Sequence, residues 1–110
     1  MNNMQQDRIL SIISLATKAG KTVSGEFSVE KAVKEGKAKL VVVSAEASDN
    51  TKKMFKNMCE FYKVPAYFYG TKEDLGHFMG KEFRASMAVT DEGLAKAVEK
   101  QLVLAGIERQ

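Results

Sequence analysis

The chain has 110 residues, of which 45% are hydrophobic and 28% charged, so it is long enough for a single globular domain over residues 1–110 and unlike a linker or a repeat. One Cys and one His exclude a disulfide framework and a thiolate zinc site, and they leave little room for a histidine metal centre. The 17 basic and 14 acidic residues give a net charge of +3, which fits a polyanionic partner without requiring one.

Nothing in the sequence predicts a membrane segment. The longest purely apolar run, Leu40 to Val43, is far shorter than the ~20 residues of a membrane span. Met1 to Arg8 lack the charged and apolar regions of a signal peptide. We therefore expect a cytoplasmic, monomeric protein without a membrane partner.

Apolar periodicity, glycines and capping residues predict alternating helices and strands. Gly20 and Gly36 are placed to end helices, Ser48 or Asp49 and Thr71 to begin them. In the third helix the expected inner stripe is Thr51, Phe55, Met58 and Tyr62. The expected elements, in chain order, are a helix over 5–19, an extended piece over 21–24, a helix from 27 or 28 to 35, a strand over 39–44, a helix from 48 or 49 to 62, a strand over 66–69, a short helix from 71 to about 79, a strand over 87–90, and a helix from 91 to about 105.

Alternation of helices with buried strands favours a three-layer α/β/α sandwich. The two long central connections are helical, which favours parallel neighbours joined by right-handed crossovers. We therefore predict an α/β fold with a four-stranded mixed, mostly parallel sheet and about five helices.

Catalysis has little support in the sequence. Ala19 to Thr22 ends like a phosphate-binding P-loop, but the position of its first Gly is Leu15 and the segment follows a helix rather than a strand. His77 has no catalytic partner, so we expect it to be exposed or satisfied locally, and Cys59 is expected to be a small buried side chain. We predict no enzyme activity, no cofactor, no metal and no small-molecule substrate.

Basic charge gathers in the first half of the chain. Residues 1–63 carry 11 Lys and Arg against 7 Asp and Glu, whereas residues 64–110 carry 6 against 7. Gly25 precedes a helix start, where exposed amides and the positive end of the helix dipole suit a phosphate. Lys31 and Lys34 lie three residues apart on this helix and can face one groove, although solvated lysines on an outer face would give the same pattern.

Several further segments carry a resemblance that covers nearly the whole chain. By these segments and by the helix start described above, the chain resembles the kink-turn RNA-binding superfamily of large-subunit ribosomal proteins, the L7Ae-like family. Within that family it is most similar to the small bacterial members of the YlxQ type. The segments concerned are Leu15 to Lys21, Ser24 to Glu26, Lys31 to Val41, Ala47 to Thr51, Tyr62 to Pro65, Leu75-Gly76 and Gly80-Lys81.

The resemblance implies an RNA site at the start of the second helix and in the loop before the last strand. The family's Gly and Lys match Gly25 and Lys31, but its base-reading Asn and Glu are replaced by Phe27 and Ser28. Phe stacks on an unpaired base where Asn would form hydrogen bonds, and Ser can make one. The RNA-binding residues that we predict are Lys18, Lys21, Gly25, Glu26, Phe27, Ser28, Lys31, Lys34, Lys81, Phe83, Arg84 and Ala85.

The resulting hypothesis is a non-catalytic, ribosome-associated RNA-binding protein that docks the start of its second helix into ribosomal or other structured RNA, of which a kink-turn is one form. The alternative is a protein-interaction module that has kept the fold and lost the RNA site. It is motivated by Phe27 and Ser28 at the base-reading positions, since an exposed Phe at a helix start can anchor a protein partner. A nucleotide-dependent enzyme rests only on the incomplete P-loop.

Overall fold

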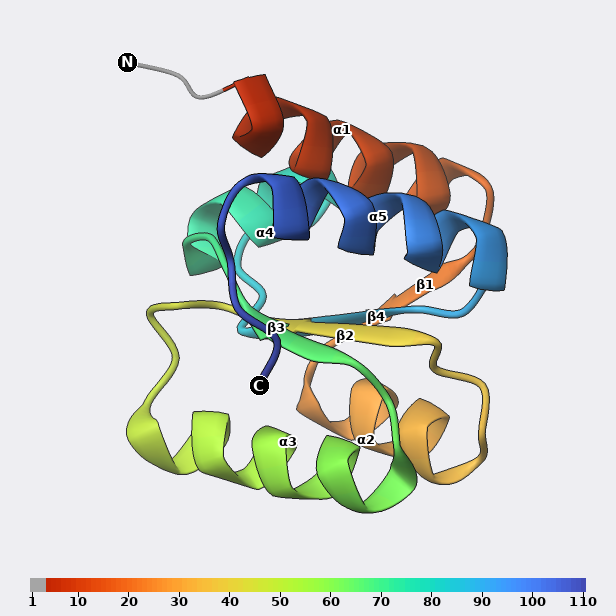
Figure 1. Ribbon diagram of the computed structural model, residues 1–110, viewed down its shortest axis with the longest axis vertical. Coiled ribbons are helices and arrows are strands. Elements are labelled where there is room, and N and C mark those ends of the chain that lie inside the picture. The colour runs from red at the N-terminus through yellow and green to blue at the C-terminus, as the bar shows by residue number, and fades with distance from the viewer. Residues whose placement is uncertain (1–3) are drawn as a thin grey trace.

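The computed structural model describes residues 4–110, with side chains from residue 8 onward, in three layers (Figure 1). One face of a four-stranded sheet is covered by α1 (Met4–Lys18), α4 (Lys72–Phe78) and α5 (Glu92–Leu104), and the other by α2 (Glu26–Lys34) and α3 (Asp49–Tyr62). The strands are β1 (Thr22–Ser24), β2 (Leu40–Val43), β3 (Ala66–Phe68) and β4 (Ser86–Val89). The predicted sandwich of five helices and four strands is confirmed over the described part of the chain. Residues 1–3, part of the segment in which no signal peptide was predicted, lie outside it.

The strand order is β1-β4-β2-β3, and the prediction of a mostly parallel sheet was wrong. Only β2 and β3 form a parallel pair, because β4 lies between β1 and β2 and is antiparallel to both. β1, β2 and β3 do run in the same direction. The connection from β3 to β4 begins and ends at the same end of the strands. Ser86, the first residue of β4, pairs with Val43, and Val43 pairs with Phe68 at the end of β3. The short helix α4 in that connection does not bring the chain back to the other end of the strands, so β4 runs in the opposite direction to β3.

The sheet is buried on both faces, as the unbroken apolar run of β2 predicted. Leu40 and Val42 pack into the cluster beneath α1, α4 and α5, whereas Val41 and Val43 pack into the cluster beneath α2 and α3. All four side chains are fully buried. Alternate residues of one strand therefore anchor the two helical layers.

Helix ends follow the predicted signals. Gly20 follows α1 with a φ of +73°, the Ser48 hydroxyl accepts from the Thr51 amide at 3.2 Å, and the Thr71 hydroxyl accepts from the Asp74 amide at 2.9 Å. The predicted inner stripe of α3 was partly wrong, because Tyr62 is 41% exposed and Cys59 takes the interior position one turn after Phe55. No described helix is long and apolar enough to cross a membrane.

Candidate nucleic-acid interface

Three helices begin at one edge of the sheet. Because β1, β2 and β3 run in the same direction, the helices that follow them, α2, α3 and α4, all start beyond the carboxyl ends of these strands. β4 begins at the same edge, so the loop that precedes it, residues 79–85, lies there as well. Helix N-termini present amide donors and a positive dipole end, which makes this edge a natural anion-binding region.

The start of α2 differs from the other helix starts at this edge. Ser48 and Thr71 cap α3 and α4 with their side chains, but the N-cap of α2 is Gly25, which has no side chain to do so. Gly25 has a φ of +90°, a conformation that favours glycine. The residues of the first turn, Glu26 to Ser28, are exposed. Their amides are therefore available to an external acceptor.

The loop 79–85 is held beside Gly25. The Gly25 amide donates to the carbonyl of Ser86 at 3.0 Å, and Arg84 Nε donates to Ser24 Oγ at 2.9 Å. Arg84 Nη1 also donates to the carbonyl of Phe83 at 2.7 Å. These bonds use only part of a guanidinium that has five N–H donors, so Arg84 is oriented and still able to bind a phosphate.

A depression of about 330 Å³ lies between α2 and this loop. Ser28 contributes to one side and Lys81 to another, and the remaining lining comes from Thr17, Thr22, Val23, Ser24 and Met79. Two aromatic side chains of the helix start and of the loop stand out of the surface, Phe27 with 78% and Phe83 with 61% of their area exposed. Exposed rings beside cationic side chains are the combination on which unpaired bases stack.

The structure brings most of the predicted site residues together. We call the following set the Gly25 edge: Gly25, Glu26, Phe27, Ser28, Lys31, Lys81, Phe83, Arg84 and Ala85. Ala85 ties the loop to β2, since its carbonyl accepts from the Ser44 amide at 2.8 Å. Lys31 is exposed and lines a shallow surface with Phe27, one helical turn away.

Lys18 and Lys21 lie elsewhere, whereas Lys34 lines the same shallow surface as Phe27 and Lys31. Lys18 ends α1 and Lys21 precedes β1, so both are at the opposite end of that strand from Gly25, roughly 10 Å away along a three-residue strand. Lys34 is in the last turn of α2, where its ammonium group binds the Glu30 carboxylate at 2.7 Å. That hydrogen bond and the charge of Glu30 raise the pKa of Lys34.

Two residues that support the edge were missed by the sequence analysis. Ser24 orients Arg84, which lies sixty positions later in the sequence, and no local sequence pattern predicts this contact. A Cβ on Gly76 would lie 2.6 Å from the carbonyl oxygen of Glu82, so only glycine lets the loop 79–85 approach α4 this closely. The signal for Gly76 was a glycine inside a helical pattern, which often marks such a close approach.

Among the side chains that the structure describes, the remaining reactive ones do not come together as a catalytic group. Cys59 is buried, and desolvation raises the pKa of its thiol to about 11, as expected of an inert interior cysteine. His77 is exposed and its ring contacts Phe78 edge-on. The segment that resembles a P-loop runs from α1 into β1, the reverse of the strand-to-helix order that phosphate wrapping needs. Among the described residues, no group of three His, Cys, Asp or Glu could hold a metal ion.

Comparison with known proteins agrees with the resemblance noted in the sequence. The family model of the ribosomal protein L7Ae/L30e/S12e/Gadd45 family matches residues 7–99. The chain is 43% identical over 84 residues to a protein named RNA-binding protein YlxQ from Bacillus subtilis (strain 168), covering 76% of this chain and 84% of the relative. It is 32% identical over 100 residues to a protein of the same name from Enterococcus faecium, covering 91% and 96%.

A solved structure of a protein with unknown function from Bacillus halodurans C superposes with a TM-score of 0.85 and 32% identity, covering 87% of this chain and 97% of that one. The fold and the family model thus point the same way. The match over residues 7–99, together with the two relatives, shows that the chain belongs to the ribosomal protein L7Ae/L30e/S12e/Gadd45 family.

Proposed function

We propose that this chain is a non-catalytic RNA-binding protein that acts as a monomer and docks the Gly25 edge into structured RNA. The observation that carries the proposal is the start of α2, which has a glycine N-cap, no side-chain cap and an exposed first turn, beside an arginine held in place by Ser24. Two relatives named RNA-binding proteins support the choice of RNA over other polyanions.

Each part of the Gly25 edge has a role in this proposal. The amides of the first turn of α2 and the guanidinium of Arg84 receive phosphates. Lys31 and Lys81 add charge on the two sides of the helix start. Phe27 and Phe83 stack on unpaired bases, and the Ser28 hydroxyl makes one hydrogen bond to a base or a ribose.

The target is structured RNA with an unpaired base beside a bend, of which a kink-turn is one form. Phe27 offers a ring rather than hydrogen-bonding groups, so the edge reads shape and stacking more than the edges of guanine bases. Ribosomal RNA is the target class that we favour, given the family of ribosomal proteins to which the chain belongs.

The proposal is tested by fluorescence anisotropy with two RNAs of equal length, a kink-turn stem and an uninterrupted duplex. We expect tighter binding to the bent stem. Neutralisation of three or four phosphates would weaken this binding roughly 10- to 100-fold between about 50 and 200 mM salt. Equal binding to both RNAs, or binding that salt leaves unchanged, would contradict the proposal.

Replacement of Lys31 by Ala is expected to weaken binding to the bent stem by about 1–3 kcal/mol, because a charge-assisted contact at the helix start is lost. Lys31 is exposed, so the free energy of unfolding should change little. The matched control is Lys100→Ala on α5, which removes the same charge from an exposed site in the other helical layer. Equal affinities of the two variants would remove Lys31 from the interface.

A second candidate function, a protein-interaction module, is favoured by the 78% exposure of Phe27 at the centre of the edge. A pull-down from lysate with and without nuclease separates the two functions. A partner that survives nuclease and is lost in Phe27→Ala supports the protein-interaction module, whereas RNA-dependent recovery supports RNA binding.

A further inference from the structure

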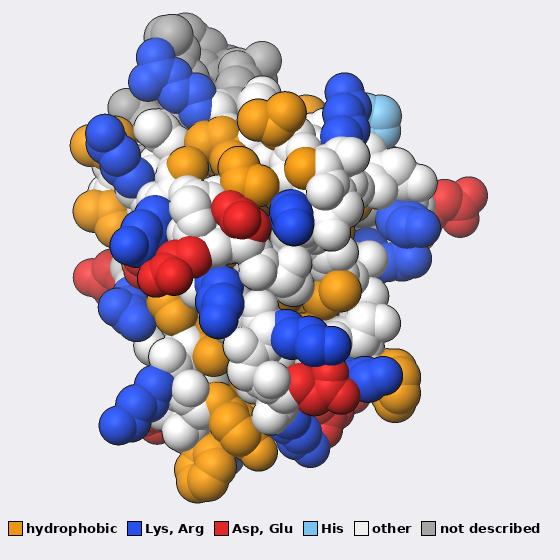
Figure 2. All heavy atoms as spheres, turned by 90° about the vertical axis from the view of Figure 1, so that its right-hand side faces the viewer, with side chains coloured by type: hydrophobic (Ala, Val, Ile, Leu, Met, Phe, Trp, Pro, Cys, Tyr) orange, Lys and Arg blue, Asp and Glu red, His pale blue; other side chains and the backbone are white. Residues whose placement is uncertain are grey.

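A second concave surface lies at the other end of the molecule from the Gly25 edge. It forms where α2 and α3 end and where β2 and β3 begin. Figure 2 views the molecule from this side and shows Lys and Arg side chains spread over the face, with fewer acidic side chains among them. The concavity has a volume of about 290 Å³. We call it the Lys63 pocket; it is lined by Val33, Lys34, Gly36, Ala38, Lys39, Tyr62, Lys63, Val64 and Pro65.

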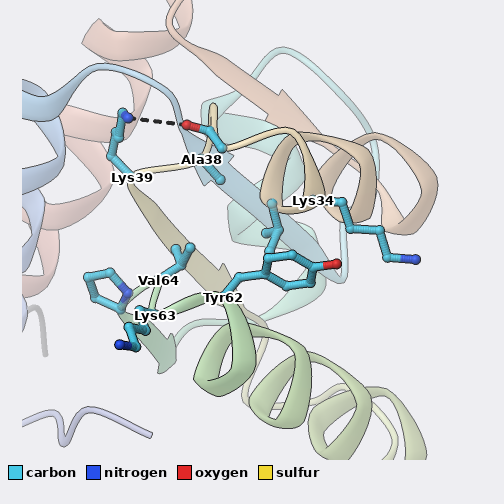
Figure 3. Close-up of a pocket in the computed structure, with 9 residues that line it drawn as sticks. Lys34, Ala38, Lys39, Tyr62, Lys63 and Val64 are labelled. Carbon is cyan, nitrogen blue, oxygen red and sulfur yellow. Dashed lines mark hydrogen bonds between the residues drawn. The ribbon is translucent and has the colours of Figure 1, made fainter.

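The lining combines an aromatic ring with three cationic side chains and contains no acidic residue. Lys34, Lys39 and Lys63 surround the Tyr62 ring, and their side chains diverge from it rather than converge inside the pocket (Figure 3). Lys39 Nζ donates to the carbonyl of Gly36 at 3.2 Å. A small anion held inside would need converging cations, whereas a polymer with a base at the centre and phosphates on both sides fits diverging ones.

The aromatic surface continues beyond Tyr62. The ring of Phe61 meets that of Tyr62 edge-on, with 4.9 Å between centroids and 78° between planes. Phe61 is 76% exposed, so it offers a second ring to solvent next to the pocket. Two adjacent exposed rings suit two consecutive unpaired bases.

Lys63 adopts a backbone conformation that normally selects glycine. Its φ is +59°, and every other residue with positive φ in the described part of the chain is a glycine. Lys63 closes the C-terminus of α3, where its amide donates to the carbonyls of Cys59 and Glu60, and glycine is the residue usually found at such a position. A side chain with a Cβ is strained in this conformation, and glycine would relieve that strain.

We propose that the Lys63 pocket binds single-stranded RNA, with one unpaired base stacked on Tyr62 and the adjoining phosphates against Lys39 and Lys63, since Lys34 is already paired with Glu30. Aromatic platforms flanked by lysines are the usual means of binding unpaired strands without sequence preference. Together with the Gly25 edge, the pocket allows one domain, 35 Å in its longest dimension, to hold a folded RNA element at one end and a flexible strand at the other.

The test titrates the full chain with a labelled oligouridylate of about eight nucleotides, which has no folded structure, and in parallel with the bent stem. Tyr62→Ala and Lys63→Gly are each expected to weaken oligouridylate binding about tenfold while leaving the stem affinity unchanged. Lys31→Ala at the Gly25 edge should instead weaken binding to the stem and leave oligouridylate binding unchanged. Lys63→Gly should also melt at the same temperature or a few degrees higher, because glycine relieves the left-handed strain, so lost binding cannot be ascribed to unfolding.

The outcomes separate this pocket from the Gly25 edge. Oligouridylate binding that is absent, or unchanged by both pocket variants, would overturn the pocket and leave the proposed function standing if the stem still binds. Displacement of oligouridylate by oligoglutamate at equal charge concentration would also overturn it, since the surface would then recognise acidic chains in general. A wild-type chain that binds oligouridylate but not the bent stem would count against the Gly25 edge and not against the pocket.

Discussion

A Gly76→Ala variant is expected to lose about 1–3 kcal/mol of folding stability and to bind the bent stem about tenfold more weakly. The added Cβ would lie 2.6 Å from the Glu82 carbonyl oxygen and 2.8 Å from the Phe83 amide nitrogen, so the backbone of the loop must move. That loop is held by the Lys81 amide bond to the Gly76 carbonyl at 2.7 Å, and it carries Phe83 and Arg84. Chemical denaturation and anisotropy measure the two losses.

The matched control is Gly93→Ala, which makes the same change inside another helix. A Cβ at Gly93 would have its nearest neighbour, Asp91 Oδ2, at 3.4 Å, and α5 begins at Glu92. We expect this variant to gain up to about 1 kcal/mol from helix propensity and to bind RNA as the wild type does. If Gly76→Ala behaves like the control, the close approach of the loop to α4 has no role in shaping the Gly25 edge.

The double variant Phe27→Asn with Ser28→Glu is expected to gain about 1–3 kcal/mol of discrimination for a kink-turn stem over a straight duplex. Both positions lie in the exposed first turn of α2, so new polar side chains there can reach guanine edges without disturbing the core. A glutamate in the first turn also suits the helix dipole. Anisotropy on the two RNAs measures the discrimination.

Phe61→Asn provides the control for the loss of an exposed aromatic ring. Phe61 is 76% exposed on α3, at the far end of the molecule from the Gly25 edge. The Phe61→Asn variant should discriminate between the kink-turn stem and the straight duplex as the wild type does. A double variant with unchanged discrimination would mean that positions 27 and 28 do not face the bases.

Local signals were sufficient to predict the elements of this fold. The buried run of β2, the hydroxyl caps at Ser48 and Thr71 and the glycine after α1 each depend on neighbours within a few positions of sequence. The place of β4 in the sheet could not be predicted in this way. The direction of β4 depends on whether the chain, after β3, re-enters the sheet at the same end of the strands or at the opposite end. Helical periodicity carries no information about this choice.

Residues close in sequence lie apart in the structure where a strand intervenes. Lys21 is only four positions from Gly25, but β1 separates them and places them at opposite ends of the sheet. Arg84 is about sixty positions from Ser24 and yet bonds to it directly. The family resemblance placed Arg84 among the predicted RNA-binding residues, and the structure places Arg84 beside the helix start, a tertiary relation about which charge and periodicity carry no information.

The most direct test of the account follows backbone amide resonances of the full chain while the bent stem is added. We expect the amides of Glu26, Phe27 and Ser28 to shift most, since they are the uncapped donors at the start of α2, and the amides of the loop 79–85 to shift with them. RNA that binds with these resonances unmoved, and with shifts confined to other parts of the surface, would contradict the claim that the start of α2 receives the RNA.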